Sequence, residues 1–137
     1  MKNLVYTLII AGVALLTSCE EERNIPEFNQ RIQEGQWRVT EIQHPDTYGN
    51  DLFKNYAIAF SEQNTITAVG INFYRGWWEM REENGPVLEI KFATEYEVPM
   101  VRLNGIWKLT EYNDQLIKMN YPNPNTGTTD KITLEKI

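Results

Sequence analysis

The residues that decide the fold are 71–94, INFYRGWWEMREENGPVLEIKFAT. From Leu88 to Phe92, apolar and charged side chains alternate, which is the two-residue period of a strand with one buried and one solvated face. The Asn84-Gly85 pair separates this run from the one before it and favours a tight hairpin, because such turns need positive φ at both residues. The stretch therefore predicts two antiparallel strands, Ile71–Arg81 and Val87–Thr94.

The same kind of pattern recurs on both sides of this hairpin, in runs rich in β-branched and aromatic residues that are bounded by Asn, Gly, Asp and Pro. It predicts about eight strands in total, the others being Gln36–Gln43, Tyr56–Ser61, Thr65–Val69, Gly105–Tyr112, Gln115–Tyr121 and Lys131–Ile137. Short strands joined mainly by hairpins indicate an antiparallel meander. We expect an all-β domain over residues 35–137, a small antiparallel up-and-down barrel, with a sandwich as the alternative.

Composition limits the functional classes. The chain has 137 residues, enough for one domain, and its 42% hydrophobic and 12% aromatic content excludes a disordered chain. A net charge of −6 argues against nucleic acid as a partner, because phosphate binding needs clustered Lys and Arg. One cysteine and one histidine exclude a disulfide framework and a His-rich metal centre, so we expect no metal and no other cofactor.

The first residues have the pattern of an export signal. A basic start at Lys2 is followed by an apolar run from Leu4 to Leu16, which is short for a membrane span and is followed by Thr17-Ser18-Cys19. Leu16-Thr17-Ser18-Cys19 resembles the lipobox of bacterial lipoproteins. The resemblance implies that residues 1–18 are a signal peptide, that Cys19 carries acyl chains such as palmitate, and that the bilayer is a partner. The alternatives are a secreted protein with an incidental cysteine and an uncleaved anchor helix.

Residues 19–34 are predicted to be an acidic tether. Glu20, Glu21 and Glu22 follow the cysteine directly, and Phe28–Ile32 is long enough for one helical turn. The acidic residues are typical of a solvated tether, and they also resemble sorting signals that display a lipoprotein at the cell surface or retain it at the inner membrane. We expect attachment to the outer membrane, on its periplasmic face or at the cell surface.

The start of the first strand resembles a known family. Gly35-Gln36-Trp37 is similar to the Gly-x-Trp opening of lipocalin-like proteins, and Asn104-Gly105-Ile106-Trp107 repeats its character in a late strand. The resemblance covers residues 35–137. It implies a barrel whose floor is closed by the tryptophan and whose interior is just wide enough for side chains or one small ligand.

The chain offers little for nucleophilic catalysis. Its one histidine, His44, lies in a predicted loop, and Ser61, the one serine after Cys19, has no Gly-x-Ser-x-Gly surroundings. We interpret His44 as a solvated loop residue. We therefore expect no catalytic residues and no enzyme.

Carboxylates are more abundant and leave two further possibilities. Glu41, Glu79 and Glu89 lie on predicted strands, so a glycosidase-like pair stays open, although two of them occupy alternating surface positions. The loop 46–51 supplies oxygen atoms but lacks the bidentate glutamate of an EF-hand, so we interpret it as a turn without a metal.

Two regions are candidates for binding. The first is the barrel interior together with the apolar loop from Glu95 to Arg102, which we expect to act as a lid or to cap the core. Ligand sites are mainly apolar with a few polar groups, and side chains of that kind fall at inward positions or in this loop. These candidates are Tyr56, Phe60, Phe92, Trp107, Tyr96 and Met100.

The second region is the predicted strand Ile71–Arg81, where apolar side chains fall on both faces. One explanation is a β-bulge at Gly76 that shifts the register and turns most of them inward. The other is an exposed aromatic patch of Tyr74 and Trp78 beside Arg75, which would suit a sugar ring or a protein partner.

Two functional hypotheses follow. The first is a lipid-anchored lipocalin-like barrel that binds a small apolar or glycan-like ligand without changing it chemically. The second is an accessory lipoprotein with a solid core that binds a protein partner through the Tyr74/Trp78 patch.

Overall fold

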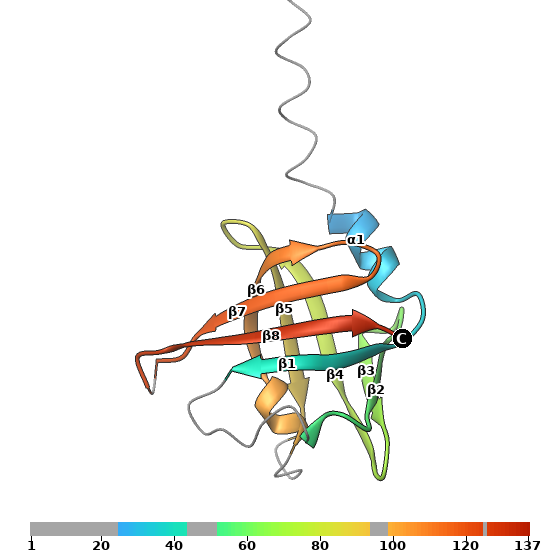
Figure 1. Cartoon of the computed structure of the whole chain (residues 1–137). Coiled ribbons are helices and arrows are strands. Elements are labelled where there is room, and N and C mark those ends of the chain that lie inside the picture. Colours follow the sequence, from blue (N-terminus) through green and yellow to red (C-terminus); the bar gives the residue numbers. More distant parts are fainter. Residues whose placement is uncertain (1–24, 44–51, 94–98, 125) are drawn as a thin grey trace, which may run out of the picture.

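The structure is a computed structural model that describes residues 25–43, 52–93, 99–124 and 126–137. Eight antiparallel strands follow one another around a closed barrel, as predicted, and β8 returns to pair with β1 (Figure 1). The elements are α1 (Ile25–Ile32), β1 (Trp37–Gln43), β2 (Ala57–Phe60), β3 (Thr65–Val69), β4 (Phe73–Glu82), β5 (Pro86–Phe92), η3 (Met100–Leu103), β6 (Gly105–Tyr112), β7 (Leu116–Pro122) and β8 (Thr129–Lys136).

The predicted hairpin between β4 and β5 is confirmed. Asn84 and Gly85 have φ angles of 55° and 116°, the positive values that favour these two residue types in a turn. The register then runs from Glu82 opposite Pro86 to Gly76 opposite Phe92 without interruption. Leu88, Ile90 and Phe92 consequently point to the same buried side.

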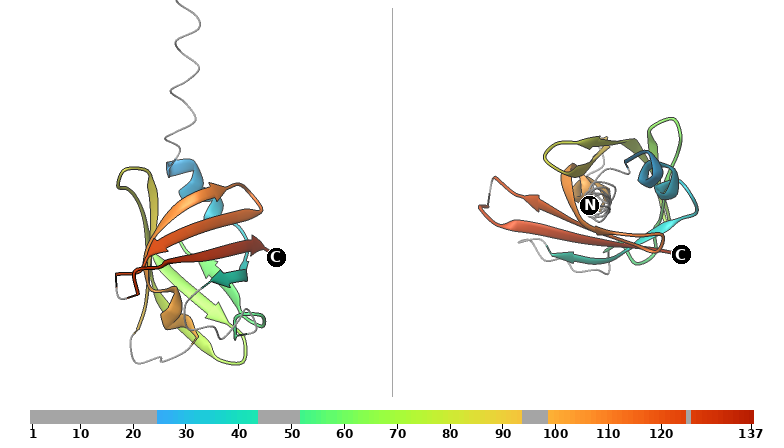
Figure 2. Two further views of the ribbon diagram at one scale, coloured as in Figure 1. Left: turned by 60° about the vertical axis from the view of Figure 1, so that its left-hand side comes forward. Right: turned by 90° about the horizontal axis from the view of Figure 1, so that it is seen from above.

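The antiparallel order places the connections alternately at the two ends of the barrel. The β2–β3, β4–β5 and β6–β7 turns share one end with α1, and the β3–β4 turn and η3 lie at the other (Figures 1 and 2). We call these the α1 end and the η3 end.

Side chains at alternate positions of the strands fill the inside of the barrel. The inward positions of every strand contribute to one buried cluster, and Phe28 and Ile32 of α1 belong to it as well. The helix is longer than the single turn predicted for Phe28–Ile32. Although we expected this segment to be part of a tether, α1 packs on the barrel through those two residues.

The β-bulge predicted at Gly76 is wrong. The register of β4 is continuous against both β3 and β5, and the shifts occur instead near Thr40 in β1 and Thr110 in β6. Gly76 allows the backbone of β5 to approach β4 closely, because a Cβ at this position would lie 2.5 Å from the Lys91 carbonyl oxygen. An uninterrupted β4 must therefore present its two apolar faces to opposite sides.

Candidate functional site

The interior candidates form part of the core. Tyr56, Phe60, Phe92, Met100 and Trp107 all belong to the one buried cluster and are at most 6% exposed. They do not gather at one place: Phe60 packs edge-to-face on Trp78 near the α1 end, with ring centroids 5.3 Å apart, and Met100 lies in η3. Tyr96, His44 and the loop 46–51 fall outside the described residues.

Both ends of the barrel are covered by short helices that tryptophans hold in place. The Trp37 indole N–H donates to the Ile32 carbonyl oxygen of α1 at 2.9 Å, and the Trp107 indole N–H donates to the Leu103 carbonyl oxygen of η3 at 2.8 Å. Buried indole N–H groups need such partners. The two helices lie at opposite ends of the barrel in Figure 2.

A tyrosine pair lies inside the η3 end. The rings of Tyr56 and Tyr74 are 5.7 Å apart, and the Asn72 side-chain amide donates to the Tyr74 hydroxyl at 3.3 Å. Burial raises the pKa of the Tyr56 phenol, and its hydrogen bond with the Tyr74 side chain raises it further. The native fold therefore favours the neutral form of the Tyr56 phenol.

The exposed patch predicted from Tyr74 and Trp78 is wrong. Tyr74 is 8% exposed and Trp78 is 1% exposed, because their positions on β4 point into the barrel. The Trp78 indole N–H also donates to the Ser61 carbonyl oxygen at 3.1 Å, so its polar group has a partner near the α1 end. Arg75, the third member of the predicted patch, is exposed on the outer face.

The exposed apolar side chains belong to the hairpin of β3 and β4. They lie at the outward-facing positions of these strands and in the turn between them. Val69, Ile71, Phe73 and Trp77 are 49%, 83%, 59% and 39% exposed, and we call these four residues the hairpin stripe. Val69 is directly opposite Phe73 in the β3–β4 ladder, and Arg75 lies between Phe73 and Trp77 on the outer face. Exposed apolar side chains that gather on one part of a surface mark interaction sites.

The charges beside the hairpin stripe are positive. Lys91 is the register partner of Trp77 and shares its outer face, and Arg75 is opposite Thr67. Neither cation makes an ion pair within the described ranges. The next carboxylates along this face, Glu79 and Glu89, are both paired with Arg81, at 3.4 and 2.6 Å.

Arg81 forms ion pairs with two of the carboxylates considered for catalysis, Glu79 and Glu89. Its hydrogen bonds with Glu89 and Glu83 raise the pKa of the guanidinium. Glu79 and Glu89 thus face one shared cation on the outside of the barrel, and both carboxylates are engaged in ion pairs with it.

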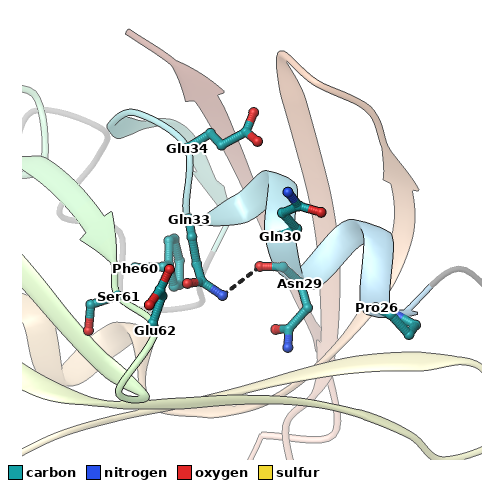
Figure 3. A pocket seen from close by; sticks show the side chains of 8 residues that line it. All are labelled: Pro26, Asn29, Gln30, Gln33, Glu34, Phe60, Ser61 and Glu62. Atoms are coloured by element: carbon teal, nitrogen blue, oxygen red, sulfur yellow. Dashed lines mark hydrogen bonds between the residues drawn. The ribbon is translucent and has the colours of Figure 1, made fainter.

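A groove separates α1 from the β2–β3 turn at the α1 end (Figure 3). We call it the α1 groove, and its volume is about 740 Å³. Its lining is mainly polar and comprises Pro26, Asn29, Gln30, Gln33, Glu34, Phe60, Ser61 and Glu62. A smaller hollow of about 130 Å³ lies on the other side of α1, against Tyr112 and Asn113.

Ser61 lies in the α1 groove but is not set up as a nucleophile. Its Oγ accepts the Thr65 backbone N–H at 3.3 Å, and its carbonyl oxygen accepts the Trp78 indole. In the part of the chain that the structure describes, no group of three or more His, Cys, Asp or Glu side chains could hold a metal ion. Over the same residues, no helix is long and apolar enough to cross a membrane.

The sequence left the two apolar faces of β4 open, and the face proposed as exposed was the wrong one. The inward positions Ile66 and Ala68 carry the signal for the correct face, because the next outward residue of that strand is Val69 and its partner is Phe73. The α1 groove has no comparable signal. It forms between residues 26–34 and 60–62, which are brought together by the packing of α1 on the barrel.

Comparison with known proteins supports the fold alone. No protein-family model matches the chain, and no curated protein does either. Among solved structures, the chain is similar to a DUF4847 family protein from Bacteroides vulgatus, with a TM-score of 0.51 and 14% sequence identity. The match covers 79% of this chain and 96% of that one, so the likeness extends over most of the fold.

Proposed function

We propose that the protein is a non-enzymatic lipoprotein, anchored in the outer membrane through acylated Cys19, whose solid lipocalin-like barrel binds a protein partner through the hairpin stripe. The observation that carries this proposal is that Val69, Phe73 and Trp77 share one outer face of β3 and β4, with the exposed Ile71 in the turn between the two strands. Exposure of large apolar side chains to water is unfavourable, so a partner that covers them gains binding free energy.

The partner that fits is a protein surface with apolar side chains flanked by carboxylates. Arg75 and Lys91 border the hairpin stripe and leave it locally positive on a chain whose net charge is −6. Charge complementarity of this kind steers encounter and selects partners. It also disfavours a second copy of the chain, which would bring the same cations to the interface.

The position of the hairpin favours a protein over the bilayer. Ile71 lies in the β3–β4 turn at the η3 end, whereas α1, which follows the predicted lipid anchor in sequence, covers the other end. A ten-residue strand such as β4 is about 30 Å long. The tip of the hairpin stripe is therefore directed away from the anchored end.

We favour the outer surface over the interior as the binding site. Five of the side chains first considered as a ligand pocket, Tyr56, Phe60, Phe92, Met100 and Trp107, are packed in the core, and a helix lies at each end of the barrel. A ligand in the interior would have to displace packed aromatic rings, whereas a partner on the hairpin stripe displaces only water.

Site-specific photo-crosslinking tests this proposal. A benzophenone amino acid replaces Phe73 or Trp77 in the full-length protein, in cells that contain its natural membrane, and Lys118 on β7 serves as the exposed control on the far side of the barrel. We expect one protein to be captured from both stripe positions and not from Lys118. The substitution Arg75→Glu should reduce that capture.

Three outcomes would contradict the proposal. They are equal capture from Lys118, adducts with a second copy of the chain, and adducts with lipid alone.

A further inference from the structure

Ile71 protrudes from the tip of the hairpin stripe. Exposure of the apolar side chains rises toward the turn, from 39% at Trp77 to 59% at Phe73 and 83% at Ile71, the highest value for a large apolar residue in the part of the chain that the structure describes. A side chain with so little cover stands clear of its neighbours. The hairpin stripe therefore ends in a projecting aliphatic group.

The turn that carries Ile71 is short and closed by its own hydrogen bond. Val69 and Phe73 are register partners, so residues 70–72 alone connect the two strands. Within this connection the Gly70 backbone N–H donates to the Asn72 carbonyl oxygen at 3.0 Å. A hairpin loop of this length restricts the backbone on both sides of Ile71.

The tyrosine pair holds the turn from inside the barrel. The Asn72 side-chain amide donates to the Tyr74 hydroxyl at 3.3 Å, and the Tyr56 phenol has hydrogen bonds with both of these residues. Gly70 packs against the same phenol ring, because a Cβ at this position would lie 2.8 Å from the Tyr56 Cδ1 atom. Ile71 is thus presented on a turn that is already ordered in the free protein.

An ordered, projecting apolar side chain favours a concave partner. Because the turn is already fixed, association loses little conformational entropy at this point. A flat surface would cover one side of Ile71, whereas a pocket surrounds the side chain and removes nearly all of its area from water. The hydrophobic gain grows with the apolar area that is buried, so a pocket binds Ile71 more strongly.

We infer that Ile71 is the anchor residue of the hairpin stripe and inserts into an apolar pocket of the partner protein, a pocket that fits a branched aliphatic side chain. This inference rests on the proposed function and specifies the shape of the partner. The rim of the pocket covers Val69 and Phe73, and its carboxylates face Arg75. Side chains that fill desolvated pockets near the centre of an interface carry a large share of its binding free energy.

A series of substitutions at Ile71 tests the inference. Because the side chain is so exposed, these changes leave the stability of the fold nearly unaffected. The readout is the yield of partner captured in cells by the benzophenone amino acid in place of Trp77 in the full-length protein. Ile71→Val keeps the branched shape and should give a yield within about twofold of the parent.

Ile71→Ala and Ile71→Trp should both reduce the yield by about tenfold, for opposite reasons. Alanine leaves the pocket unfilled, whereas the tryptophan ring is too large to enter it. Ile106→Ala is the matched control, because Ile106 is also an exposed isoleucine but lies on β6, outside the hairpin stripe. This control should give the yield of the parent.

The outcomes separate this inference from the proposed function. A parent-like yield for Ile71→Ala would overturn the inference alone, and so would an undiminished yield for Ile71→Trp, the result expected of a flat apolar surface. New lipid adducts in Ile71→Trp would overturn it as well, since they would place the tip in a bilayer. If the parent itself captures no protein, the proposed function fails and the inference fails with it.

Discussion

The indole N–H of Trp37 reaches the carbonyl oxygen of Ile32 over 2.9 Å, and this bond joins the first strand to the helix that covers the end of the barrel. Both residues are essentially inaccessible to solvent. The bond thus lies in a protected place, where hydrogen bonds matter most because water cannot replace the lost partner.

Replacing Trp37 by Phe should loosen α1. The substitution leaves the Ile32 carbonyl oxygen without its donor and removes part of a buried ring, so the free energy of unfolding should fall by about 2–4 kcal/mol. Urea denaturation followed by circular dichroism measures the change. Trp107→Phe, which removes the equivalent bond to Leu103 at the η3 end, should cost a similar amount. A variant as stable as the parent would show that the bond contributes nothing to holding α1.

The neighbouring tryptophans of β4 should behave in opposite ways. Trp78→Ala empties a buried site and should lower the free energy of unfolding by about 3–5 kcal/mol. Trp77→Ala, on the exposed face, should change the free energy of unfolding by less than about 1 kcal/mol. It should also abolish the capture of the partner by a benzophenone amino acid at position 73. Chemical denaturation of the two variants side by side checks the assignment. Equal losses of stability would contradict the placement of the two rings.

Gly76→Ala adds only one methyl group but should strongly destabilise the protein. The added Cβ would lie 2.5 Å from the Lys91 carbonyl oxygen and 2.9 Å from the Phe92 Cα, both of them backbone atoms that move only if the β4–β5 ladder moves. We expect a loss of about 2–3 kcal/mol, typical of overpacking. Arg75→Ala, one position earlier on the exposed face, is the control and should be nearly neutral. Thermal unfolding of both variants makes the comparison.

Stability should fall at alkaline pH because of Tyr56. Its pKa is raised above the ordinary value of 10.0, so the native state holds the phenol proton more tightly than the unfolded chain does. This contribution is complete below pH 10 and is lost as the pH rises through the raised pKa. Guanidinium denaturation between pH 8 and 11 should show a fall that is shallower in Tyr56→Phe. Parallel profiles for parent and variant would count against the effect.

Asn29→Ala should raise the stability of the protein. It removes a buried acceptor that has no partner and introduces a better helix former, so the free energy of unfolding should rise by about 0.5–1 kcal/mol. Gln30→Ala, which changes an exposed position of the same helix, controls for helix propensity. If both variants gain equally, the buried acceptor carries no cost.

The barrel could be predicted from the sequence because its determinants are local. Alternation along Leu88–Phe92 and the positive φ angles favoured by Asn84-Gly85 each specify strand and turn without knowledge of distant residues. The orientation of β4 could not be predicted in the same way, because aromatic residues occur on both faces of this strand. It depends on the pairing with β3, where Ala68 lies opposite Tyr74 and leaves room for that ring inside.

The candidate sites depend even more on tertiary packing. The hairpin stripe appears only once β4 has a defined inner face, and the α1 groove requires a helix from residues 25–32 to lie beside the β2–β3 turn. Neither arrangement follows from local periodicity. A residue pattern identifies the strands, but the surfaces that the strands present depend on which of their side chains are packed in the core.

The closure of the barrel also constrains when the protein can fold. In the described ranges β1 meets its sequence neighbour β2 only where Trp37 pairs with Ile58, but it follows β8 from Trp37 to Gln43. The first strand is therefore secured mainly by β8, a pairing between distant parts of the sequence of the kind that slows folding. A chain that lacks residues 129–136 cannot complete the barrel, so β1 can settle into the sheet only once β8 is present.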